Sequence, residues 1–217
     1  MLWGLLLAAL LGVGAAAVHQ RLQRAERQAI RERVAALPVL GRVPDFMLVN
    51  RDWRVVRQRD LVGSPWIADF IFTRCVSTCP LLSARMARLD RTLPAGLGIH
   101  LVSFSVDPAH DAPPVLERYA RARGASRRWL FLTGGDKQIR RLSQQGFKLA
   151  LAPGGSPAAG TGAAAGVGAG TAPEAILHST RFVLVDPAGA IRGYYQALDR
   201  EALRQLTADA KALAAAP

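Results

Sequence analysis

The sequence predicts an α/β fold, a mixed sheet with helices on both faces, preceded by an apolar N-terminal helix. From residue 38 onward, short apolar stretches typical of strands alternate with stretches whose apolar residues recur at helical spacing. Near the end of the chain, two strand-like stretches are joined by DPAG, a turn typical of a hairpin. The 217 residues, half of them hydrophobic, are enough for one domain core with some extension.

The expected strands and helices alternate along the chain. Strands are expected at 46–50, 66–72, 99–106 and 131–132, with a hairpin at 182–185 and 190–195, and helices at 80–93, 114–123, 136–145 and 201–215. The apolar stretch WIADFIF at 66–72 predicts a buried central strand, and Pro80 opens the helix that follows it. This order of elements is typical of a thioredoxin-like mixed sheet flanked by helices.

The N-terminal segment 1–18 is expected to be a membrane anchor. Leu2 to Val18 carries no charge, and as a helix it would reach roughly 26 Å, just short of a bilayer core of about 30 Å. The small residues Ala15, Ala16 and Ala17 leave a cleaved signal segment as an alternative, and a buried soluble helix as another. Residues 19–37 have helical spacing and end before Pro38, so they predict a juxtamembrane helix or stalk.

Residues 38–217 are expected to form one thioredoxin-like domain with an insertion at residues 153–173. Residues 153–173 are rich in glycine and alanine with no periodic apolar face, which indicates a flexible surface excursion. The net charge is +12, but only three of the 28 basic residues are lysine, and the bases form no long run. With no aromatic platform beside them, they indicate a solvated basic surface and argue against nucleic-acid binding.

The chain contains two cysteines, Cys75 and Cys79, in FTRCVSTCPLL. They are expected where a buried strand meets a helix, and backbone N–H groups at such a place lower a thiol pKa. A structural disulfide would close a very short loop and stabilise little. Two incidental buried thiols remain a further alternative. The position therefore favours a redox pair or half of a metal site.

A metal site needs more than two thiolates, and the four histidines are the candidates for a third ligand. His19 is expected on the stalk, His100 within a strand and His110 in the loop after VDP. His178, in LHST before the hairpin, could reach the cysteines, or it could be a loop histidine that only donates a hydrogen bond. Two thiolates and one imidazole form a soft site that suits Cu(I).

Several motifs in order resemble the Sco/SenC family of thioredoxin-fold copper proteins, which assist assembly of the dinuclear copper centre of cytochrome c oxidase. They are FIFTRCVSTCPLLSARMARL, LVSFSVDPAHDAPPVLERYA, WLFLTGG and LHSTRFVLVDPAGAIRGYY. The resemblance implies copper ligands at Cys75, Cys79 and His178, as Cu(I) or also Cu(II). Asp107 and Asp111 match the family's VDPxxD motif, in which Asp107 could shape the site and either residue could instead cap a turn.

The resemblance also implies where the protein acts and with which partners. The expected partners are the copper-bearing subunit of cytochrome c oxidase, a periplasmic copper donor, and the membrane through the N-terminal helix. The expected location is the inner membrane with the domain in the periplasm. Five arginines between residues 21 and 33 conflict with this orientation, because basic flanks usually stay on the cytoplasmic side.

The leading hypothesis is a copper metallochaperone that delivers copper to the oxidase. The alternative is a thiol-disulfide oxidoreductase that reduces the copper-ligand cysteines of the oxidase subunit, with Cys75 as the attacking thiol because it lies further out on the loop. A peroxiredoxin-like peroxidase is a third hypothesis.

Overall fold

The computed structural model describes residues 2–149 and 180–216. The expected insertion at 153–173 and His178 therefore lie outside the described residues. The helices are α1 (Leu2–Ala36), α2 (Cys79–Thr92), α3 (Pro113–Ala122), α4 (Asp136–Arg141) and α5 (Arg200–Ala215). The strands are β1 (Gly41–Arg42), β2 (Met47–Asn50), β3 (Val55–Arg57), β4 (Trp66–Ile71), β5 (His100–Ser105), β6 (Trp129–Thr133), β7 (Arg181–Val185) and β8 (Ala190–Gln196).

These strands form one mixed sheet in the order β1-β8-β7-β4-β5-β6-β2-β3. Strands β4, β5 and β6 are parallel, and the outer pairs are antiparallel. Every residue of β4 is buried, as expected for a central strand covered on both faces. The central, buried position predicted for this strand is confirmed.

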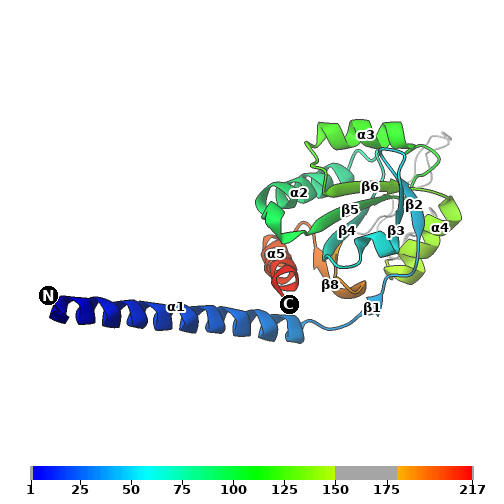
Figure 1. Cartoon of the computed structure of the whole chain (residues 1–217). Helices are drawn as coiled ribbons and strands as arrows, with labels where there is room; N and C mark the ends of the chain where they lie inside the picture. The colour runs from blue at the N-terminus through cyan, green and yellow to red at the C-terminus, as the bar shows by residue number, and fades with distance from the viewer. Residues whose placement is uncertain (1, 150–179, 217) are drawn as a thin grey trace, which may run out of the picture.

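Helices cover both faces of the sheet, and each face has its own apolar core (Figure 1). On one face α2, α3 and α5 pack through Leu82, Met86, Leu116 and Leu206. On the other face, α4 and the π-helical turn η3 (Leu142–Gly146) pack on an aromatic cluster of β4 and β5. The predicted α/β architecture with flanking helices is confirmed.

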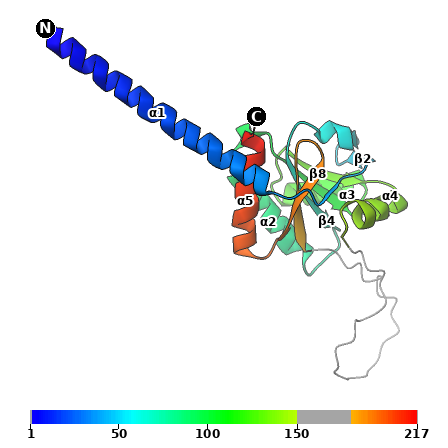
Figure 2. The same ribbon diagram turned by 90° about the horizontal axis from the view of Figure 1, so that it is seen from below.

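The N-terminal helix α1 projects from the domain, and its last turns lie beside α5 (Figures 1 and 2). Arg33 donates to the buried Asp209 at 2.6 Å, and Asp209 also accepts from the Tyr195 hydroxyl at 2.7 Å. Arg192 donates to the Val34 carbonyl at 2.9 Å. The base of α1 is thereby fixed to the domain by an ion pair and hydrogen bonds.

Segments 1–18 and 19–37, expected as two units, belong to a single helix that ends at Ala36. Across the part of the chain that the structure describes, no helix combines the length and apolar character that a membrane span requires. The anchor therefore stays a prediction.

Other boundaries differ in ways that have a physical cause. The weak strand expected at 131–132 is the longer β6, which is paired with β5 on one side and β2 on the other. The helix expected over 136–145 ends as α4 at Arg141 and continues as η3. Strands β1 and β3 were not expected, because two or three residues at a sheet edge carry too little periodicity to be recognised.

Candidate metal centre

Both cysteines lie where the central strand β4 meets helix α2. Cys75 is in the loop after β4, and Cys79 is the first residue of α2. The Cys75 backbone N–H donates to the Phe72 carbonyl at 3.3 Å, which turns the chain after the strand. The Cys75 residue is 8% exposed and Cys79 is 0% exposed. Their sulfurs are not joined in a disulfide.

A sulfur atom, not the usual hydroxyl, accepts the first N–H of α2. The side chain of Thr78, at the N-cap position, makes no capping hydrogen bond. Instead the Cys79 N–H donates to the Cys75 Sγ at 3.3 Å, and the Ser77 hydroxyl lies 3.6 Å from the same Sγ. N–H groups at a helix start carry partial positive charge, so this contact favours Cys75 as thiolate.

The two thiols differ in acidity for reasons that their contacts explain. Burial raises the pKa of the Cys75 thiol, but hydrogen bonds from the Cys79 N–H and from Ser77 outweigh burial and lower the pKa to about 7. Burial raises the pKa of the Cys79 thiol far above its ordinary value, and the nearby Cys75 and Asp69 charges raise it further. Near neutral pH Cys75 is therefore partly thiolate, whereas Cys79 remains a thiol.

This difference predicts the pH profile of thiol alkylation. We expect the rate of Cys75 modification by iodoacetamide to rise with pH through about 7 and then level off, because only the thiolate attacks. Cys79 should stay unmodified over the same range. Tandem mass spectrometry of the labelled peptide distinguishes the two positions, and earlier labelling of Cys79 would contradict the assignment.

Asp107, which follows β5, holds the cysteine loop through an arginine. Arg74 donates from Nε and Nη2 to one carboxylate oxygen of Asp107, at 3.0 and 2.6 Å. The backbone carbonyl of Asp107 also accepts the N–H of Asp111 at 2.9 Å, a turn contact that does not depend on the aspartate side chain. The Asp107 side chain therefore fixes Arg74, the residue directly before Cys75.

Asp111 holds the same loop at Thr73, one residue before Arg74. It is fully buried and accepts three hydrogen bonds. They come from the Thr73 N–H at 3.0 Å, the Thr73 hydroxyl at 2.5 Å and the Ser105 hydroxyl at 2.6 Å. The loop before Cys75 is thus tied to the end of β5 by a buried carboxylate.

Replacement of Asp111 by alanine is expected to destabilise the domain by about 3 kcal/mol or more, because three donors would lose a charged acceptor in a buried place. Urea unfolding of the copper-free protein measures the change. Asp136→Ala is the control, since Asp136 is exposed and pairs with Arg140 in the next turn of its own helix. A loss of stability equal to that of the control would contradict the role of Asp111.

Asp69 lies in the middle of β4 and is fully buried. Neither carboxylate oxygen has a hydrogen-bond partner in the described part of the chain. Burial raises the pKa of the Asp69 carboxyl to about 7, and the Ser103 hydroxyl on β5 opposes this only in part. Asp69 was not among the site residues predicted from the sequence, although an acidic residue at the centre of the mostly apolar stretch WIADFIF could have identified it.

None of the three described histidines forms a metal-ligand cluster with the two cysteines. His100 begins β5 opposite Trp66, at the end of the sheet away from Cys75. His110 is exposed in the turn after β5, where its backbone N–H donates to the backbone carbonyl of Asp107 at 3.0 Å. His19 is exposed on α1. Within residues 2–149 and 180–216 there is no group of three or more side chains of metal-ligand type.

The predicted third ligand, His178, lies outside the described residues, but the strand that follows it is placed. Strand β7 runs antiparallel to β4, with Val183 opposite Ala68 and Val185 opposite Trp66. The start of β7 therefore lies beside the end of β4 that leads to Cys75. A soft metal such as copper fits the two sulfurs, because thiolates are its preferred ligands.

Comparison with known proteins agrees with this arrangement. The family model described as SCO1/SenC matches residues 40–215. The chain belongs to the SCO1/SenC family. The Sco relative "SCO1 protein homolog" of Bacillus subtilis (strain 168) is 30% identical over 178 residues, which cover 80% of this chain and 83% of the relative. The family resemblance of the sequence motifs is confirmed.

Two solved Sco structures have the same fold. BsSco, described as a member of the Sco family of cytochrome c oxidase assembly proteins with an identified disulfide switch, is 29% identical with a TM-score of 0.66, covering 83% of this chain and 97% of that one. ScoI of Bradyrhizobium japonicum, solved with copper bound, is 18% identical with a TM-score of 0.61, covering 76% of this chain and 98% of that one. At that identity the second likeness shows the shared fold.

Proposed function

We propose that the protein is a copper metallochaperone that delivers copper to the dinuclear copper centre of cytochrome c oxidase. The observation that carries the proposal is the contact between the Cys79 N–H and the Cys75 Sγ at 3.3 Å, which holds two cysteines at one point of a Sco-family domain. The description of BsSco as a member of a family of oxidase assembly proteins supports it.

In this proposal Cys75, Cys79 and His178 bind the copper ion as cargo. Cys75 is the first ligand to be available, because about half of it is thiolate near pH 7. Cys79 becomes a ligand by losing its proton as the metal binds. A soft set of two sulfurs and one imidazole suits Cu(I), and Cu(II) is accepted in the same place if the imidazole is present. Release to the recipient then proceeds by exchange of one ligand at a time.

The test of the ligand set compares two histidine variants of the full-length chain. We expect reduced wild-type protein to bind one Cu(I) ion, and His178→Ala to bind it much more weakly. The control is His110→Ala, because His110 is exposed in the turn after β5 and is not expected to bind copper. Absence of stoichiometric copper in the reduced wild type, or equal affinities of the two variants, would overturn the proposal.

We also propose that residues 1–18 anchor the chain in the inner membrane with the domain in the periplasm. The uncharged N-terminal segment and the oxidase partner support this location, while the arginines after it argue for the opposite orientation. Protease added to spheroplasts should digest the domain. Protection of the domain until the spheroplasts are lysed would contradict the periplasmic location.

The second candidate function is a thiol-disulfide oxidoreductase, favoured by the unequal acidity of the two thiols. The Cys75 thiolate would attack a substrate disulfide and form a mixed disulfide, releasing one substrate thiolate. Cys79, after losing its proton, would attack the Cys75 sulfur, so that the cysteine pair is oxidised and the substrate leaves as a dithiol. Steady turnover of a disulfide substrate with a thiol reductant as electron source would favour this function over copper delivery.

A further inference from the structure

A basic groove lies between helices α2 and α5. Its volume is about 670 Å³, and it is lined by side chains of these two helices only. Five of them are cationic, and the lining that the structure describes contains no acidic side chain: the cations are Arg85, Arg88, Arg200, Arg204 and Lys211. We call this the α2–α5 groove.

Most of these cations have no acidic partner within the described part of the chain. Arg204 pairs with Glu201 on its own helix, whereas no ion pair joins Arg85, Arg88, Arg200 or Lys211 to any described residue. The Nε of Arg85 is buried and has no hydrogen-bond acceptor among residues 2–149 and 180–216. A buried donor without an acceptor is costly, so this position is suited to an anionic group from outside the domain.

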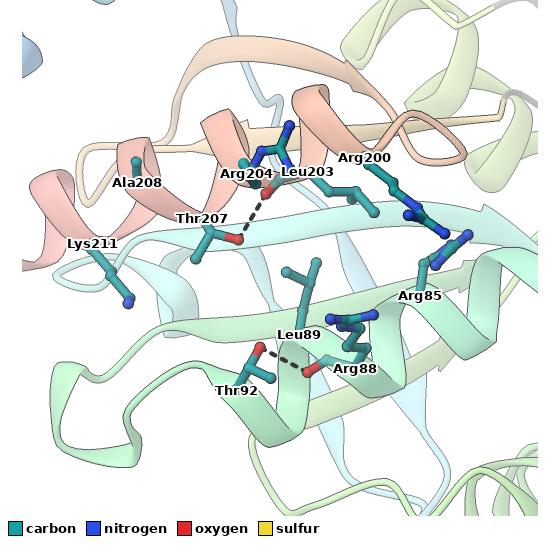
Figure 3. A pocket seen from close by; sticks show the side chains of 10 residues that line it. All are labelled: Arg85, Arg88, Leu89, Thr92, Arg200, Leu203, Arg204, Thr207, Ala208 and Lys211. Carbon is teal, nitrogen blue, oxygen red and sulfur yellow. Dashed lines mark hydrogen bonds between the residues drawn. The ribbon is translucent and has the colours of Figure 1, made fainter.

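The two arginines at one end of the groove strengthen this indication. Figure 3 shows the side chains of Arg85 and Arg200 pointing toward one another across the groove, one from each helix. Two guanidinium groups that face one another repel unless an anion lies between them. A carboxylate fits because it accepts hydrogen bonds from planar guanidinium groups on both sides.

The base of the groove is apolar, which restricts the kind of anion. Leu89 of α2 and Leu203 of α5 line it between the basic residues, and both pack on the core of this face. The two threonines of the lining donate to carbonyls of their own helices, Thr92 to Arg88 and Thr207 to Leu203. Their hydroxyls are therefore already used, and the groove offers cations above an apolar strip.

We propose that the α2–α5 groove docks an acidic amphipathic segment of a partner protein, with carboxylates on Arg85 and Arg200 and apolar side chains on Leu89 and Leu203. A helix with acidic and apolar residues on one face has both features at the required spacing. A flat lipid surface would meet the exposed arginines but would not fill the concave apolar strip between the helices.

The groove is also close to the cysteines along the chain. Arg85 lies six residues after Cys79 on the same helix, which corresponds to about 9 Å along its axis. A partner docked in the groove would therefore lie near the cysteine loop. Only the use of this contact for copper delivery rests on the proposed function, because docking itself requires no copper.

The test uses the full-length chain and a labelled synthetic helical peptide with leucines at i, i+3 and i+4 spacing and glutamates beside them. We expect fluorescence anisotropy to show binding that weakens as the salt concentration rises. A peptide with glutamine in place of every glutamate should bind at least about tenfold more weakly. All measurements are made without copper, so failure of the copper proposal would leave their outcome unchanged.

Two pairs of arginine variants with equal loss of charge test the place of binding. Arg85→Gln with Arg200→Gln should weaken peptide binding by at least about tenfold. Arg118→Gln with Arg127→Gln, at exposed positions outside the groove, should leave it within about twofold. Because Arg85 is half-buried, Arg88→Gln with Lys211→Gln at exposed positions provides a second groove variant whose fold is less at risk.

Three results would overturn the proposal. The first is absence of binding of the glutamate peptide to the wild type, and the second is equal weakening by the groove variants and the arginine pair outside the groove. The third is preferential binding of vesicles of phosphatidylglycerol and phosphatidylcholine, lost in the groove variants, with no binding of the peptide. That last result would assign the groove to anionic lipid.

Discussion

Cys75→Ser is expected to abolish stoichiometric Cu(I) binding by the reduced protein. Serine keeps an acceptor for the Cys79 N–H, so the start of α2 should be preserved, but it replaces a soft sulfur by a hard oxygen. Loss of a residue that merely orients a metal ligand already costs about 10- to 100-fold in affinity. Loss of the ligand that is thiolate near pH 7 should exceed about 100-fold. Competition with a Cu(I) chelator measures the change.

The matched control is Val76→Ala, in the same loop between the two cysteines. Val76 is 94% exposed and offers no ligand, so its truncation changes the loop without changing the donor set. We expect its copper affinity to stay within about threefold of the wild type. Retention of one tightly bound Cu(I) by Cys75→Ser would show that this sulfur is not a ligand.

Much of the fold was predictable because the central elements carry strong patterns. WIADFIF predicted β4 to within one residue, since a short, mostly apolar stretch bounded by turn residues has few alternatives. The hairpin of β7 and β8 followed from DPAG. The edge strands β1 and β3 did not follow, because their pairing depends on tertiary contacts that short segments do not encode.

The site was only partly predictable, for a similar reason. The position of Cys75 and Cys79 between a strand and a helix followed from local sequence. The bonds from Asp107 and Asp111 to Arg74 and Thr73 did not, because they join residues more than thirty positions apart in the chain. VDPxxD alone was compatible with a simple turn, and only the parallel pairing of β4 with β5 brings it beside the cysteine loop.

The buried Asp69 links the stability of the domain to the acidity of Cys79. Its carboxyl is 0% exposed and lacks a hydrogen-bond partner among the described residues. A charged form in that place is unfavourable, and its field also raises the pKa of the Cys79 thiol. A proton on Asp69 therefore stabilises the fold and eases ionisation of Cys79.

The pH dependence of stability follows from the direction of the Asp69 shift. The folded-state pKa, about 7, lies above the ordinary value of 3.8, so the folded protein holds this proton more tightly than the unfolded chain. The stabilisation is fully present below about pH 4 and is lost as the pH rises through about 7. The shift corresponds to roughly 4 kcal/mol for a fully buried group.

Asp69→Asn should remove this loss, because asparagine is neutral at every pH and has nearly the shape of the protonated carboxyl. We expect the variant to match the wild type near pH 4 and to exceed it in free energy of unfolding by up to roughly 4 kcal/mol at pH 8. Urea unfolding at both pH values measures the difference. The variant should also show a lower Cys79 pKa, because the Asp69 charge that raises it is gone.

Asp52→Asn is the matched control, since Asp52 is exposed on the turn between β2 and β3. It removes the same charge from the surface and should leave the pH profile of the wild type unchanged. If Asp69→Asn and the wild type lose stability in parallel between pH 4 and pH 8, the carboxyl of Asp69 is ionised throughout. If only the stability profile changes while the Cys79 pKa stays fixed, Asp69 acts on the fold without acting on the thiol.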